Sequence, residues 1–119
     1  MPVRPLTSSL LKWPDAASVL GAARAWARAE RGRRPDLVRL GVFGSYARGD
    51  AGVGSDIDLV AIVRQAAEPF VRRAAAWDIT SLPVPAEILV YTEAEWRALR
   101  ARGGRFADML ATTTVWLVD

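Results

Sequence analysis

The chain has 119 residues, of which 51% are hydrophobic and 24% charged, and this suits one small globular domain with one core. The net charge is +3, and all of the 16 basic residues except Lys12 are arginines, with no block of five like charges. This pattern favours scattered arginines on solvated helix faces over a nucleic-acid-binding role.

Several kinds of site are excluded by composition. Cysteine is absent and so is histidine, which removes disulfides, thiolate or imidazole zinc sites and histidine bases. A metal site would therefore use oxygen ligands, as magnesium or manganese does. No apolar run is long enough for a membrane span, and the N-terminus has no apolar signal core. We therefore expect a cytoplasmic protein without membrane attachment.

The first third of the chain predicts a tail followed by a helix. Residues 1–13 contain two prolines and a polar run, and we expect them to form an N-terminal tail to a single domain over residues 14–119. Residues 14–32 carry apolar side chains three and four positions apart, which is typical of an amphipathic helix. A stripe of arginines runs beside that face, and we interpret it as the solvated edge of the helix.

The middle of the chain predicts two strands joined by a glycine-rich loop. Residues 37–43 are apolar except for Arg39, and residues 56–63 are apolar on both faces, so we expect the second strand to be central in a sheet. Between them, residues 44–55 read as a loop with one helical turn after Gly44.

The last part predicts alternating helices and strands. Pro69 opens a helix whose buried side we expect to carry Phe70, Val71, Ala74 and Trp77. A third strand follows over residues 86–91. Thr92 and Glu95 form a capping box for a helix that runs to about Arg102. A short helix with Phe106, Met109 and Leu110 on one face and an edge strand over residues 115–118 complete a mixed α/β (α+β) domain, with a three- to four-stranded sheet flanked by helices.

Asp56 and Asp58 form the first candidate site. In a strand, residues two apart face the same way, so these two carboxylates would repel each other unless a cation lay between them. Two divalent ions held by such carboxylates suit phosphoryl or nucleotidyl transfer. The alternative is that one aspartate caps a turn and the other pairs with an arginine, because a bare D-x-D motif is common by chance.

Gly44 and Ser45 form the second candidate site. Glycine lets the backbone approach a ligand closely, and the free amides of a helical turn at Ser45 would point at an anion. Ten residues separate Ser45 from Asp56, so a phosphate-binding turn and a carboxylate pair would lie at the same end of adjacent strands.

The combined pattern, Gly44-Ser45 followed after ten residues by Asp56-x-Asp58, resembles the signature of the DNA polymerase beta-like nucleotidyltransferase superfamily. The longer string GSYARG…SDIDLVAIV resembles its minimal nucleotidyltransferases, the MntA-like antitoxins. The resemblance implies that Gly44 and Ser45 hold the triphosphate of a substrate such as ATP, and that Asp56 and Asp58 bind two Mg²⁺ ions, with Mn²⁺ as a substitute.

The resemblance also implies roles for two further residues. Arg48 would contact phosphate or brace the loop. Glu87 matches a third carboxylate, usually Asp in the family, and would act as a metal ligand and help to take the proton of the acceptor hydroxyl. Glu is one methylene longer than Asp, so the geometry could differ; the other interpretation is an exposed glutamate at a strand edge. Asp50, another acid of the loop, is expected to be solvated.

Three functions remain open from the sequence. The first is transfer of AMP from ATP to a hydroxyl, for which the resemblance implies a tyrosine of a HEPN-domain partner protein, with a partner or a homo-oligomer completing the site. The second is an antitoxin that acts by occlusion, with a weak nucleotide site. The third is a nucleotidyltransferase for small molecules such as antibiotics.

Overall fold

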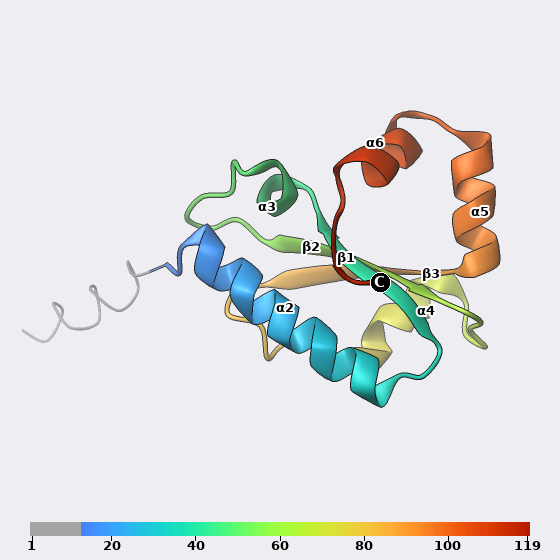
Figure 1. The fold of residues 1–119 in the computed structure, drawn as a ribbon, viewed down its shortest axis with the longest axis horizontal. Coiled ribbons are helices and arrows are strands. Elements are labelled where there is room, and N and C mark those ends of the chain that lie inside the picture. Colours follow the sequence, from blue (N-terminus) through green and yellow to red (C-terminus); the bar gives the residue numbers. More distant parts are fainter. Residues whose placement is uncertain (1–12) are drawn as a thin grey trace, which may run out of the picture.

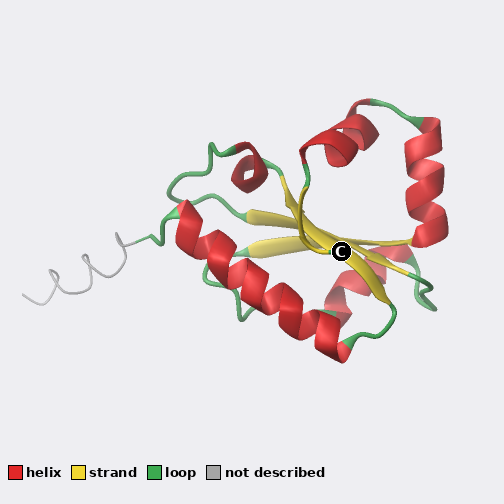
Figure 2. Cartoon of the chain, viewed as in Figure 1, coloured by secondary structure: helices red, strands yellow, loops and turns green. Residues whose placement is uncertain are grey.

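A mixed four-stranded sheet organises the chain (Figures 1 and 2). The computed structural model describes residues 13–119, so the predicted tail lies outside the described residues except for Trp13, which packs half-buried against the core. The strands are β1 (Leu37–Phe43), β2 (Ile57–Val63), β3 (Ala86–Thr92) and β4 (Val115–Val118), and they lie in the order β3-β2-β1-β4. β1 is antiparallel to both β2 and β4, whereas β2 and β3 are parallel, which confirms the predicted mixed sheet.

Helices cover both faces of this sheet. Figure 1 shows α2 on the opposite side of the sheet from α5 and α6. The helical segments are α2 (Ala16–Arg33), α3 (Ser45–Arg48), α4 (Phe70–Arg73) with the 3₁₀ turn η1 (Ala74–Ala76), α5 (Glu93–Arg102) and α6 (Arg105–Thr113). Within residues 13–119, none of them combines the length and the apolar character that crossing a bilayer requires.

The helix α2 confirms the prediction from periodicity. It begins after Asp15, whose carboxylate accepts a hydrogen bond of 2.7 Å from the Ser18 amide and so satisfies one of the free N–H groups at the helix start. Its apolar positions face the sheet, and Val19, Ala23 and Ala27 are fully buried there.

The strand β2 is central, as predicted, and is buried on both faces. Ile57, Leu59 and Ala61 face the core under α2, while Val60 and Ile62 pack on the other face in a second cluster with Trp96 and Leu110. The strand begins at Ile57, one residue later than expected, with a 2.9 Å hydrogen bond from the Ile57 amide to the Pro85 carbonyl.

The segment after β2 differs from the prediction. The helix α4 has only four residues and gives way to the 3₁₀ turn η1, so the expected buried side forms only at Trp77 and, half-buried, at Ala74. Trp77 is buried, but Phe70 is 37% and Val71 84% exposed. Arg73 takes the inward position instead, because its guanidinium binds the carboxylate of Glu95 and the carbonyls of Glu68 and Val90.

Candidate active site

Three strands bring the predicted site residues to one end of the sheet. β1 ends at Phe43, which lies opposite Asp58 near the start of β2, and Asp58 in turn lies beside Glu87 near the start of β3. Residues 58 and 87 alternate with core residues of the α2 face, so both carboxylates lie on the sheet face that α5 and α6 cover. The turn α3 lies at this same end (Figure 1).

Gly44 brings the turn after β1 into contact with Asp58. Its φ of +75° and ψ of −150° belong to a region that is essentially restricted to glycine. A Cβ at this position would also collide with Oδ2 of Asp58. The carboxylate therefore lies directly against the backbone of the turn, and no other residue fits here without a shift.

The helical turn α3 presents free amides at its start. The amides of Ala47 and Arg48 donate to the carbonyl of Gly44 at 3.1 and 3.0 Å, and the next two amides donate to the carbonyl of Ser45. These bonds leave the amides of Ser45 and Tyr46 at the open end of the turn, where backbone N–H groups attract an anion. Gly44 and Ser45 therefore lie in a turn directly after β1, and their binding of phosphate stays a prediction.

The acids influence one another electrostatically. Burial raises the pKa of Asp58 above its ordinary value, the negative charges of Glu87 and Asp56 raise it further, and the positive charge of Arg48 lowers it. Asp58 therefore lies close enough to the other two predicted carboxylates for their charges to act on it; Asp58 is half-buried, and Asp56 and Glu87 are exposed.

The donor set suits a hard divalent cation, since it consists of carboxylate oxygens whose mutual repulsion a cation would relieve. Within residues 13–119, however, no three acidic side chains converge on a common point that would hold a metal ion. Asp56, Asp58 and Glu87 are the residues available to hold one, after rotation of the exposed side chains.

Arg48 forms an ion pair with Asp50 within the loop. Its Nε donates to Asp50 Oδ2 at 3.2 Å, and both side chains are more than half exposed. Asp50 is therefore exposed, as expected, but it is also paired. The contact of Arg48 with phosphate stays a prediction.

Tyr46 is a positioning residue that the sequence analysis missed. Its ring is 96% buried, and its hydroxyl donates to the carbonyl of Ser55 at 3.4 Å, while Ser55 Oγ accepts from the Gly52 amide at 2.9 Å. These contacts connect the turn α3 to the end of the loop just before Asp56. A large aromatic residue in an otherwise small and polar loop was the available signal.

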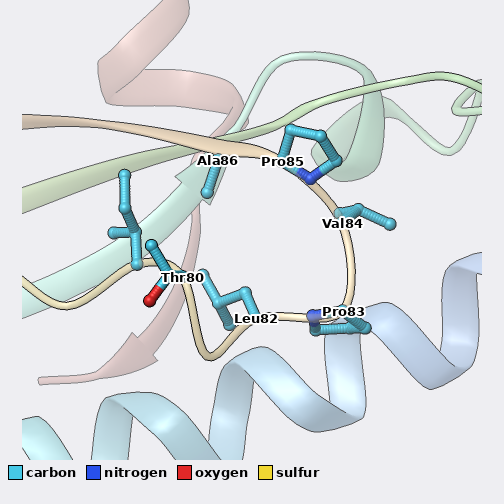
Figure 3. Close-up of a pocket in the computed structure, with 7 residues that line it drawn as sticks. Thr80, Leu82, Pro83, Val84, Pro85 and Ala86 are labelled. Atoms are coloured by element: carbon cyan, nitrogen blue, oxygen red, sulfur yellow. The ribbon is translucent and has the colours of Figure 1, made fainter.

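A cavity of about 420 Å³ lies next to the segment that leads into β3 (Figure 3). Leu82, Pro83, Val84 and Pro85 line it, and no charged side chain takes part. It offers no group for acid, base or metal chemistry and is separate from the acids described above.

The turn at Gly44 and the acids of β2 and β3 lie together at one end of a mixed sheet, as the sequence motif predicted for a nucleotide site. The nucleotidyltransferase domain family matches residues 26–102, which is more than half of the chain and includes all six predicted site residues, and the chain belongs to this family.

The fold is also similar to a solved structure. A protein from Sulfolobus solfataricus, described as a presumed nucleotidyltransferase, aligns with a TM-score of 0.59 and 21% sequence identity, over 85% of this chain and 80% of that one. This similarity supports the fold alone. No curated protein matches the sequence at a significant level.

Proposed function

We propose that this protein is a Mg²⁺-dependent nucleotidyltransferase that moves AMP from ATP to a hydroxyl of another protein. The observation that carries the proposal is the contact between the Gly44 turn and the Asp58 carboxylate, with Glu87 on the next strand. The turn to which the proposal assigns phosphate and the acids to which it assigns metal ions therefore share one end of the sheet.

The turn would hold the triphosphate. The amides of Ser45 and Tyr46 and the Ser45 hydroxyl can donate to phosphate oxygens. Arg48 already lies near Asp58, since its charge lowers the pKa of that carboxyl, and it would contact phosphate if its pair with Asp50 opened.

The acids would hold the metal ions. Asp56, Asp58 and Glu87 are the ligands in this proposal. Two Mg²⁺ ions, when bound, supply positive charge for the attacking and leaving oxygens of the displacement.

The reaction itself is a substitution at the α-phosphorus. The acceptor oxygen forms a new O–P bond, the bond between the α-phosphorus and the bridging oxygen breaks, and pyrophosphate leaves with that electron pair. The acceptor proton passes to Glu87, directly or through one water. Glu87 is exposed, so an acceptor from outside can reach it.

The choice of acceptor comes from the resemblance to MntA-like antitoxins. It supports a tyrosine of a HEPN-type toxin as the acceptor and an antitoxin role for this chain. A cytoplasmic location, the preference for adenine and a homo-oligomeric state stay predictions.

The proposal is tested with ATP labelled either at the α- or at the γ-phosphate, incubated with the protein, Mg²⁺ and a lysate of its source cells. We expect label on a protein band from the α-labelled ATP only. Asp58→Asn should reduce this transfer at least about a hundredfold, because it removes the central carboxylate. Asp50→Asn, a change of the same kind in the loop, should retain transfer within about tenfold.

Each other outcome has a defined meaning. ATP binding without a labelled product would contradict transfer and favour an antitoxin that acts by occlusion. A labelled small molecule such as an aminoglycoside, in place of a protein, would favour the third function considered above.

A further inference from the structure

A pocket of about 470 Å³ lies on the sheet face that carries Asp58 and Glu87, between β3, α4, α5 and α6. Most of its lining is aromatic or aliphatic. The residues are Phe70, Tyr91, Glu95, Ala98, Leu99, Arg102 and Phe106.

This pocket is connected to the site through Phe106. The Phe106 ring packs edge-on against Phe43, with ring centroids 6.2 Å apart, and Phe43 lies opposite Asp58 in the sheet. Along β3, Glu87 and Tyr91 lie on the same face, four residues and about 13 Å apart. The pocket therefore lies about 13 Å from Glu87 along β3, a distance that about four residues of an extended peptide span.

The position of the pocket indicates whether it would lie on the side of the leaving pyrophosphate or on the side of the acceptor. In a displacement at phosphorus, the attacking and leaving oxygens lie roughly in line. In the proposed site the pyrophosphate lies at the Ser45 turn after β1, so the acceptor approaches from the opposite side, which is that of β3. The pocket is on this side, about 13 Å from Glu87 along β3.

We propose that the pocket receives an apolar side chain that flanks the acceptor hydroxyl on a protein substrate; this inference rests on the proposed function. The lining has two phenylalanines, a tyrosine and a leucine, which suit an aromatic or branched aliphatic group. A polyhydroxylated or polycationic small molecule would need several acids and amides here, and the lining has Glu95 alone.

The charges of the pocket favour an acidic flank on the same substrate. The Glu95 carboxylate is neutralised by Arg73, with N–O distances of 2.5 and 3.1 Å. Arg102 has no ion pair among residues 13–119. Apolar surface also continues beyond the pocket at Val71, which is exposed and follows Phe70 in the chain.

The test uses two synthetic peptides, each with a single tyrosine. One has leucine and glutamate on both sides of it, and the other has glycine and serine. We expect the first peptide to shift the backbone NMR signals of Tyr91, Leu99 and Phe106 in the full chain, and the second to leave them unchanged.

Two variants on α5 distinguish the effect of filling the pocket from the effect of a change on the surface outside it. Ala98 lines the pocket, so Ala98→Trp fills it without removing a contact, whereas Ala101→Trp makes the same change at an exposed position outside the lining. We expect Ala98→Trp to raise the KM for the first peptide about tenfold or more and to leave the affinity for ATP unchanged. Ala101→Trp should behave as the wild type, and the NMR spectra report whether both variants are folded.

Three results would contradict the proposal for the pocket or distinguish it from the proposed function. Equal KM values for the two variants, or peptide-induced shifts elsewhere, would contradict the pocket as the acceptor site. A loss of ATP affinity in Ala98→Trp would assign the pocket to the nucleoside instead. Shifts at the pocket with no AMP transfer by the wild type to any acceptor would support docking of the peptide while refuting the proposed function.

Discussion

At Gly44 the backbone takes a φ of +75° while the carboxylate of Asp58 lies against the Cα atom. This position thus imposes two requirements that glycine alone meets. One is a backbone conformation closed to other residues, and the other is space for a neighbouring side chain. Gly49, which ends the same helical turn at φ +85°, is subject to only the first requirement, since nothing lies within 4 Å of a Cβ placed there.

The two glycines therefore predict different results on substitution by alanine. Gly44→Ala should lower the free energy of unfolding by about 1–3 kcal/mol through backbone strain, with a further loss from the collision, and should abolish ATP binding. Gly49→Ala should cost only about 1–2 kcal/mol and retain binding. Urea unfolding and calorimetric titration with Mg·ATP measure both effects. Normal ATP binding by Gly44→Ala would contradict the placement of phosphate at this turn.

Tyr46 connects the turn α3 to Ser55 and so to the loop end before Asp56. Tyr46→Phe removes one hydroxyl and leaves the Ser55 carbonyl without this donor, so we expect a loss of about 1 kcal/mol in stability. Amide hydrogen exchange at residues 52–56 should accelerate more than exchange in β1. Ser55→Ala, which removes the bond to the Gly52 amide, is the matched change in the same loop. Unaltered exchange in both variants would show that the loop is fixed by other contacts.

At the level of elements, the pair of Arg73 and Glu95 joins α4 to α5 over 22 positions in the sequence. Glu95 also closes the capping box of α5, since its carboxylate accepts from the Thr92 amide at 2.9 Å. The hydrogen bond from Arg73 is the main cause that lowers the pKa of Glu95 to about 2. The pair therefore stabilises one wall of the pocket, and it makes the stability of the fold depend on pH.

Because the Glu95 pKa is lower in the folded chain than in the unfolded one, its contribution to stability is fully present above about pH 5. It is lost as the pH falls toward 2. We expect Glu95→Gln to lower stability at pH 7 by on the order of 1 kcal/mol, because the side chain is 42% exposed and solvent screens the pair. The variant should also have a flatter stability profile between pH 5 and 2 by thermal unfolding. Glu93→Gln, in the same helical turn, is the control, and an equal effect of both changes would refute the role of Arg73.

The helices and strands differ in how well the sequence predicted them. The strand 37–43 and the helix from Glu93 to about Arg102 were predicted correctly, because apolar runs and the capping box are local signals. Phe70 and Val71 were wrongly predicted to be buried, because Arg73 takes the inward position through partners on β3 and α5. Such partners are distant in sequence, and no local pattern contains them.

For the whole molecule, the spacing in the sequence predicted which residues lie close together but not which contacts their side chains make. Gly44, Ser45, Asp58 and Glu87 come together because β1 is antiparallel to β2 and β2 is parallel to β3. The motif predicted that Gly44, Ser45 and Asp58 lie together, and the resemblance to the family implied that Glu87 joins them. The contact of Gly44 with the Asp58 carboxylate, the bond from Tyr46 to the loop and the pocket beside Phe106 depend on side-chain packing among several elements, which spacing does not specify.

The central claim is that three strands build one site for a nucleotide and divalent metal ions. The most direct measurement is paramagnetic broadening of backbone NMR signals by Mn²⁺ in the presence of ATP. We predict broadening of residues 44–46, 56–58 and 86–88 at low Mn²⁺ concentration, and its loss in Asp58→Asn. Broadening that is confined to other exposed acids such as Asp78 and Asp108, or that is unchanged by Asp58→Asn, would contradict the account.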